Sequence, residues 1–145
     1  SVAGTYNVTA TATATAGGSG SASFTWTVGS ATCATQTNGT DVAIPDNTTV
    51  SSSIVVSGCT GTASASSTVE VHIKHTYRGD LVVDLIAPDG SVYNLLNRTG
   101  GSADNVNQTF TKNLSPETAN GTWNLRVRDA ATADTGYIDS WKISL

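Results

Sequence analysis

The sequence lacks features that whole classes of protein need. Only 12% of its 145 residues are charged, and the seven Lys and Arg residues are scattered singly in a chain of net charge −4. Without a basic stripe, neither nucleic acid nor an anionic membrane surface is expected as a partner. No apolar run approaches the roughly 20 residues of a membrane span. No segment places apolar residues at helical spacing either, so the missing features leave β-structure as the expectation.

Cysteine is scarce, with only Cys33 and Cys59, each beside residues typical of turns. An even count in a chain rich in Thr, Ser and Asn favours a disulfide between them and an oxidising, extracellular compartment. The alternative is two buried free thiols in a cytosolic protein. A metal site would need more ligands than two cysteines supply. The chain also starts without Met or a leader, which is typical of a mature or excised piece.

Residues 1–35 are low in complexity and alternate between apolar and polar side chains with the period of a β-strand. One run contains Tyr6, a second contains Phe24 and Trp26, and the segment 17–20 between them suits a flexible turn. The pattern predicts one β-hairpin. A lone hairpin is marginal in water, so we expect this one to pack on another part or to be a fragment.

From residue 36 onward, short strands are separated by Gly, Pro, Asn and Asp. The run Ala87-Pro88-Asp89-Gly90 predicts a type I turn. About eight strands with no helix between them predict an all-β fold, a jelly-roll β-sandwich with the extra N-terminal hairpin. We expect Trp123 and Trp141 in its core. The predicted strands are 41–44, 49–57, 67–76, 80–87, 92–97, 108–112, 122–128 and 140–145.

The most specific motif is His75-Thr76-Tyr77-Arg78-Gly79-Asp80-Leu81, followed by a β-branched strand and Pro-Asp-Gly. It resembles the central signature of the P domain (Homo B domain) of kexin/furin-like and bacterial secreted proteases. Further pieces fall in the order of that family: 41–46, Asp104 with Asn107, 121–125, and 136–138 with Trp141. The resemblance covers Gln36–Leu145. Furin-like members carry an aromatic-rich stretch that 114–120 lacks, so the resemblance favours a bacterial host.

The resemblance implies a non-catalytic C-terminal accessory domain of a secreted serine or metalloendopeptidase. Such a domain binds the catalytic domain of its own protease and supports its folding, stability and regulation. We expect a monomer. Residues 1–35 resemble the last strands of a bacterial putative-Ig (cadherin-like) domain, which divides the chain into 1–35 and 36–145. The rival interpretations are a module that binds collagen-like or other fibrous protein substrate, and a bare spacer or adhesin repeat.

No residue is expected to be catalytic. His72 and His75 are an odd number of positions apart on one predicted strand, so they point to opposite faces and cannot share a site. No hydrolase or phosphate-binding motif is present. Arg78-Gly79-Asp80 spells a tripeptide that integrins bind. We interpret it instead as a tight bend in which Gly79 permits positive φ and Arg78 pairs with a carboxylate.

Calcium is the candidate cofactor, as a structural ion. Asp80 and Asp84 share a face but lie about 13 Å apart at about 3.3 Å per residue, too far for one ion. Loop residues are better candidates because Ca²⁺ takes six to eight oxygen ligands. They could also be simple turn formers. The candidate ligands are Asp41, Asp46, Asp104, Asn107 and Asp129, with Asn105 and Asp134 nearby in the sequence.

Overall fold

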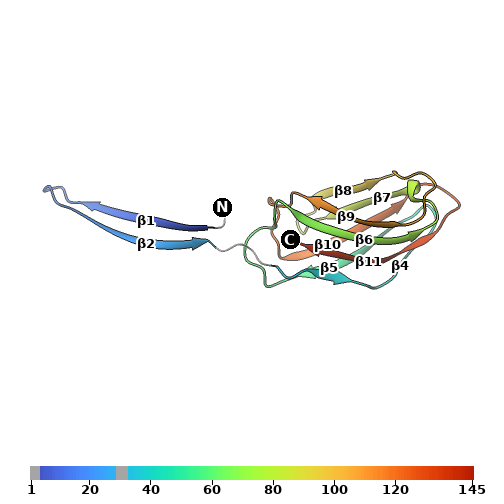
Figure 1. Ribbon diagram of the computed structural model, residues 1–145, viewed down its shortest axis with the longest axis horizontal. Coiled ribbons are helices and arrows are strands. Elements are labelled where there is room, and N and C mark those ends of the chain that lie inside the picture. Colours follow the sequence, from blue (N-terminus) through green and yellow to red (C-terminus); the bar gives the residue numbers. More distant parts are fainter. Residues whose placement is uncertain (1–3, 29–32) are drawn as a thin grey trace. The chain divides into compact units, whose positions relative to one another are not determined.

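The structure, a computed structural model, describes residues 4–28 and 33–145. The chain forms two compact units, Ser1–Ser30 and Ala31–Leu145, and each is described by itself (Figure 1). Both units are built from strands, and the helical structure in the described ranges is one 3-10 turn, η1 (Arg78–Asp80). These ranges hold no helix with the length and apolar character needed to cross a bilayer.

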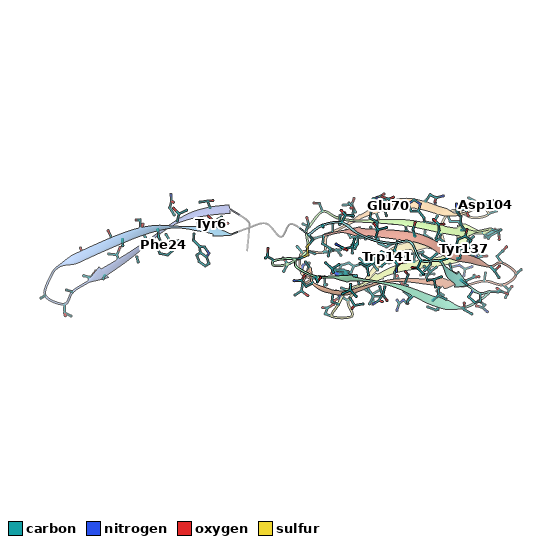
Figure 2. The ribbon with its side chains drawn as sticks, turned by 90° about the horizontal axis from the view of Figure 1, so that it is seen from below. Tyr6, Phe24, Glu70, Asp104, Tyr137 and Trp141 are labelled. Carbon is teal, nitrogen blue, oxygen red and sulfur yellow. A yellow bond between two sulfur atoms is a disulfide. The ribbon has the colours of Figure 1, made fainter. Side chains whose placement is uncertain are left out.

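The first unit is a β-hairpin of two ten-residue strands, β1 (Gly4–Thr13) and β2 (Ser19–Val28). Tyr6 lies opposite Trp26, and opposed residues of an antiparallel pair share one face. The apolar residues therefore gather on one face, and the other face carries only Thr, Ser and Asn side chains. Because two strands make a single layer, Phe24 stays 56% and Trp26 60% exposed (Phe24 is labelled in Figure 2).

The second unit is a sandwich of two antiparallel sheets. One sheet has the strand order β5-β10-β7-β8, and the other has the order β3-β11-β6-β9, with β4 also paired to β11. The strands are β3 (Gln36–Asn38), β4 (Val42–Ile44), β5 (Thr49–Val56), β6 (Ser67–His75), β7 (Leu81–Ile86), β8 (Val92–Asn97), β9 (Val106–Lys112), β10 (Gly121–Asp129) and β11 (Gly136–Ser144).

The connections of the sandwich are those of a jelly roll. Strands β3 and β4 pair with successive stretches of β11, at 141–143 and 136–138, so they act as one interrupted strand. If β3 and β4 are counted as one strand, the sandwich has eight strands, four in each sheet. Every connection then crosses between the sheets except the β7–β8 hairpin, as in a double-sheet jelly roll. The predicted fold class, with its extra N-terminal hairpin, is confirmed.

Alternate residues of the two sheets face inward and form the core. Trp123 of β10 and Trp141 of β11 are 0% and 1% exposed, as predicted (Trp141 is labelled in Figure 2). Their indole nitrogens are hydrogen-bonded, because Trp123 Nε1 donates to the Ala119 carbonyl and Trp141 Nε1 to Ser52 Oγ, each at 3.0 Å. The buried indoles therefore carry no unpaired donor.

Seven of the eight predicted strands agree with the structure to within two residues at each end. The predicted type I turn is also confirmed, since the Gly90 N–H donates to the Ala87 carbonyl at 2.9 Å and Asp89 lacks the positive φ of a type II turn. Strand β3 was not predicted, because three polar residues show no periodicity. The last strand begins at Gly136 instead of residue 140, because the register shifts between Ile138 and Ser140 and breaks the alternation.

Candidate functional site

The signature segment ends β6 and brings a buried histidine to the interior. His75 Nε2 lies 3.5 Å from Asp129 Oδ2, and both side chains are 0% exposed. Since β6 and β10 belong to different sheets, this contact joins the two layers at one end of the sandwich. The other ring nitrogen, Nδ1, accepts from the Tyr77 N–H at 3.2 Å and lies 3.0 Å from the Tyr77 carbonyl.

The Arg78-Gly79-Asp80 tripeptide forms η1 and packs against the loop that follows β8. The Arg78 N–H donates to the Ala103 carbonyl and the Gly79 N–H to the Gly101 carbonyl, both at 2.8 Å. A Cβ on Gly79 would lie 2.9 Å from the Gly101 oxygen. The prediction of a tight bend is therefore confirmed but its reason was wrong. Gly79 does not have positive φ; glycine is needed there for close backbone approach.

The partner predicted for Arg78 is also wrong. Its Nη2 donates to Gln108 Oε1 at 2.7 Å, an amide oxygen on β9, instead of to a carboxylate. The guanidinium near Asp80 belongs to Arg98, whose Nη2 lies 4.0 Å from Asp80 Oδ1 and whose Nε donates to the Gly79 carbonyl at 3.3 Å. Asp80 is only 7% exposed. The tripeptide is thus tied to β9 and to the loop that follows β8, and its residues Gly79 and Asp80 are buried.

The two histidines lie on opposite faces of β6, as predicted. His75 is buried, and His72 lies on the outer face, where Nε2 lies 2.9 Å from Glu70 Oε1 and Nδ1 lies 3.0 Å from Asn107 Oδ1. Lys142 Nζ lies 2.6 Å from Glu70 Oε2 (Glu70 is labelled in Figure 2). This outer network links β6, β9 and β11, and its histidine does not face the buried one.

The network shifts the titration of two of its members. Hydrogen bonds from Lys142 and then His72 hold the pKa of the Glu70 carboxyl below its ordinary value. The Glu70 carboxylate, followed by the Asn107 oxygen, raises the pKa of the His72 imidazole because both favour the charged ring. His72 is therefore held as a cation on the sheet surface at a higher pH than a solvated histidine.

The five candidate calcium ligands have separate contacts. Asp129 faces His75, Asp46 Oδ1 accepts from the Ala133 N–H at 3.1 Å, and Asn107 bonds His72. Asp104 lines a pocket of about 370 Å³ with Lys74, His75, Thr76, Asn105, Thr135, Gly136 and Tyr137. Asp104 and Tyr137 are labelled in Figure 2, and Asp41 is exposed between β3 and β4. Across 4–28 and 33–145, no three His, Cys, Asp or Glu side chains converge as a metal-binding group. The five do not fit a preformed site, and calcium binding stays a prediction.

Cys33 and Cys59 form a disulfide, which confirms the predicted bond. The bond joins the segment before β3 to the segment after β5, 26 residues further along the chain. Closing a loop of that length stabilises the folded state by about 3.5 kcal/mol in the chain-entropy model. The disulfide thus anchors the first edge of the sandwich, where β3 contributes only three residues.

The fold defines this chain as a jelly-roll β-sandwich module with one disulfide and an additional hairpin. Residues 64–145 match the family model of the proprotein convertase P-domain. The chain belongs to this family, whose members are non-catalytic domains. The resemblance noted in the signature segment is therefore confirmed.

The relatives are proteases that are much longer than this chain. Leupeptin-inactivating enzyme 1 of Streptomyces exfoliatus is 59% identical over 125 residues, which cover 82% of this chain and 28% of the relative. The transglutaminase-activating metalloprotease of Streptomyces mobaraensis is 42% identical over 142 residues, 97% of this chain and 19% of the relative. A calcium-dependent protease of Trichormus variabilis is 42% identical over 87 residues, 53% of this chain and 13% of the relative.

A solved structure shares the fold. The serine protease of Aeromonas sobria matches with a TM-score of 0.56 at 17% identity, covering 98% of this chain and 27% of that protein. At this identity the likeness speaks for the fold alone. In each of these comparisons the chain spans less than a third of the longer protein.

Proposed function

We propose that this chain is the accessory domain of a secreted bacterial protease, and that it supports the folding, stability and regulation of the catalytic domain. One observation carries the proposal: the chain matches P-domain regions that make up only 28% and 19% of relatives named as an inactivating enzyme and a metalloprotease. The remaining length of those relatives leaves room for a separate catalytic part. The disulfide supports an oxidising, extracellular location.

The physical route is linkage between the two domains. Contacts that form only with the folded protease lower the free energy of the folded state relative to the unfolded chain. Because both domains belong to one polypeptide, their effective concentration is high, and weak contacts suffice. The accessory domain therefore needs no tight binding site for its protease.

The test is deletion of residues 36–145 from the full-length secreted polypeptide. We expect less secreted protease, incomplete maturation and a lower melting temperature of the catalytic part. A matched control deletes residues 4–28 only and should leave maturation unchanged. Unchanged secretion, maturation and melting without 36–145 would show that the domain does not support its protease.

A second role, binding of protein substrate, is favoured by exposed tyrosines near the signature segment. Tyr77 is 40% and Tyr137 37% exposed, and Tyr137 lines the pocket that contains Asp104. Aromatic rings that remain partly exposed suit contacts with protein chains. Retention of this 145-residue chain on insoluble fibrous protein, lost on Tyr77→Ser with Tyr137→Ser, would support this role. A pure stabiliser should not be retained.

Structural calcium is part of the proposal, supported by the relative named as a calcium-dependent protease. A bound ion must be completed by backbone carbonyls and water, because the candidate side chains are not gathered in advance. Thermal unfolding in CaCl₂ should then shift upward relative to EGTA, with MgCl₂ as the control. Equal melting temperatures in the three buffers would exclude a stabilising calcium site in this chain.

A further inference from the structure

The outer face of the four-stranded sheet is arranged in rows of side chains. The register places Thr49 and Val82 on either side of Arg128 in one row. The next row, two residues along each strand, places Ser51 and Asp84 on either side of Arg126. Residues of β10 between these positions are buried in the core, so both arginines face outward from the middle of the sheet.

In the Arg126 row the charges are fully paired. Arg126 Nη2 donates to Asp84 Oδ2 at 2.9 Å, and Asn94 Nδ2 donates to Asp84 Oδ1 at 2.8 Å. Asp84 is only 8% exposed. Each carboxylate oxygen thus accepts a hydrogen bond, so Asp84 holds Arg126 in place, and Asp84 forms no hydrogen bond or ion pair with Arg128.

The Arg128 row is open. Within the described residues, neither the Arg128 guanidinium nor the Thr49 hydroxyl makes a hydrogen bond or an ion pair. The other three arginines each have a partner: Arg78 bonds Gln108, Arg98 bonds the Gly79 carbonyl, and Arg126 bonds Asp84. Arg128 and Thr49 line a pocket of about 280 Å³ together with Val82, Asp84 and Arg126. This pocket is called the Arg128 pocket below.

The chemistry of the Arg128 pocket suits a carboxylate. A guanidinium presents a planar fork of donors that matches the two oxygens of a carboxylate, and the Thr49 hydroxyl can donate a further hydrogen bond. The neighbouring Asp84 carboxylate and the net charge of −4 oppose a phosphate dianion or a polyanion. Val82 supplies an apolar wall. A single Asp or Glu side chain therefore fits better than a phosphate group.

We propose that the Arg128 pocket receives an Asp or Glu side chain from the catalytic part of the same polypeptide. This inference rests on the proposed accessory function. A single exposed ion pair contributes little to binding, and a separate protein would also have to overcome its loss of translational and rotational freedom. A tethered domain avoids most of that loss. One guanidinium gives too weak a contact to hold a separate protein. We therefore infer that the carboxylate belongs to the same polypeptide.

The first test compares the reactivity of Arg128 in two proteins. Phenylglyoxal labelling, read by mass spectrometry, should be slower at Arg128 in the full-length polypeptide than in this 145-residue chain. A carboxylate held on the guanidinium should slow the reaction by about threefold, within the range expected of one ion pair. Equal labelling rates at Arg128 in the two proteins would overturn the proposal.

The second test uses charge variants of the full-length polypeptide. Arg128→Glu should speed thermal inactivation of the protease by about threefold or more, and Arg128→Gln by less. Both effects should shrink in 1 M NaCl, where exposed charges are screened. Lys112→Glu is the matched control, since it makes the same charge change on β9 of the other sheet and should have little effect. If Arg128→Glu behaves as Lys112→Glu does, the Arg128 pocket does not bind the protease.

Two controls separate the possible failures. The 145-residue chain with Arg128→Glu should have the same melting temperature as the unmodified chain. If its melting temperature is lower, Arg128→Gln is used in the full-length test instead of Arg128→Glu. If deletion of residues 36–145 destabilises the protease but Arg128→Glu does not, the docking inference fails and the accessory function stands. If the deletion has no effect, the accessory function itself fails.

Discussion

The hairpin and the sandwich share one sequence pattern but differ in how much of their apolar surface is buried. In both, apolar and polar residues alternate along the strands. In the sandwich this alternation leaves Trp123 and Trp141 0% and 1% exposed, whereas in the hairpin Phe24 and Trp26 remain 56% and 60% exposed. The difference shows that alternation creates an apolar face, and that burial of the face requires a second layer of strands.

The two units also differ in charge. All eighteen Asp, Glu, Lys and Arg residues and both histidines lie after residue 40. The hairpin is thus held by backbone pairing and by contacts such as the hydrogen bond between Thr9 Oγ1 and Ser23 Oγ at 2.8 Å. The sandwich adds a disulfide, buried polar contacts and surface ion pairs. Any dependence of stability on side-chain titration between about pH 4 and 9 should therefore come from the sandwich.

The largest expected difference between the units lies in their tryptophans. Trp123→Ala should lower the free energy of unfolding by about 3–5 kcal/mol, because it opens a cavity and removes a buried hydrogen bond. Trp26→Ala should change it by no more than about 0.5 kcal/mol, because the ring is exposed. Urea unfolding followed by circular dichroism measures both. A similar loss from the two variants would mean that the hairpin face is covered in solution.

Reduction of the disulfide should act on the sandwich alone. Replacing Cys33 and Cys59 together by serine should cost about 3.5 kcal/mol in the chain-entropy model. The hairpin has no cross-link in its described residues, so its amide exchange rates should not change. The measurement is the urea midpoint of the double variant, with hydrogen exchange resolved by segment. A loss confined to the hairpin would contradict the assignment of the disulfide to the sandwich.

Glycine substitutions should also affect the stability of the sandwich more than that of the hairpin. A Cβ at Gly136 would lie 2.1 Å from the Lys74 carbonyl oxygen, so Gly136→Ala must displace β11 from β6. We expect a loss of about 2 kcal/mol, typical of overpacking. Gly20 of the hairpin has open space around its Cβ position, and Gly20→Ala should be neutral or slightly stabilising. Thermal melts compare the two, and an equal loss would show that the space around Gly20 is filled in solution.

The smallest expected effect is the pH dependence due to His72. Its pKa is raised in the folded state, so its contribution is complete below the unfolded pKa of about 6.5 and is lost as pH rises through the folded pKa. After solvent screening we expect at most about 0.5 kcal/mol. His72→Gln should remove this part of the stability difference between pH 5.5 and 8.5. An unchanged difference would assign the pH dependence to other groups.

Patterns within single strands were predictable from the sequence. The strand period, the Ala87–Gly90 turn, the disulfide and the opposite facing of His72 and His75 all follow from local spacing or from cysteine count. The short strand β3 has no alternation of apolar and polar residues, and the bulge at Asp139 interrupts this alternation in β11. Local spacing also suggested a positive φ at Gly79, while the true constraint is the approach of Gly101 from a loop about twenty residues away.

Contacts between strands were not predictable in this way. The sequence suggested loop acids as calcium ligands. In the structure Asp129 faces His75 of the opposite sheet, and Asn107 bonds His72 of the neighbouring strand. The Arg128 pocket has a weak local signal, two arginines two residues apart on one strand. Only the register with β5 and β7 shows that Asp84 pairs with the first of them and leaves the second open.

By itself the sequence determined which side of the longer strands is apolar, because side chains alternate with a period of two, and it determined the family through the segment around His75. Only the tertiary structure decided which apolar faces are buried, which arginines have a partner and why Gly79 must be glycine. Those outcomes depend on which strands lie side by side, and pairing partners here are often tens of residues apart along the chain.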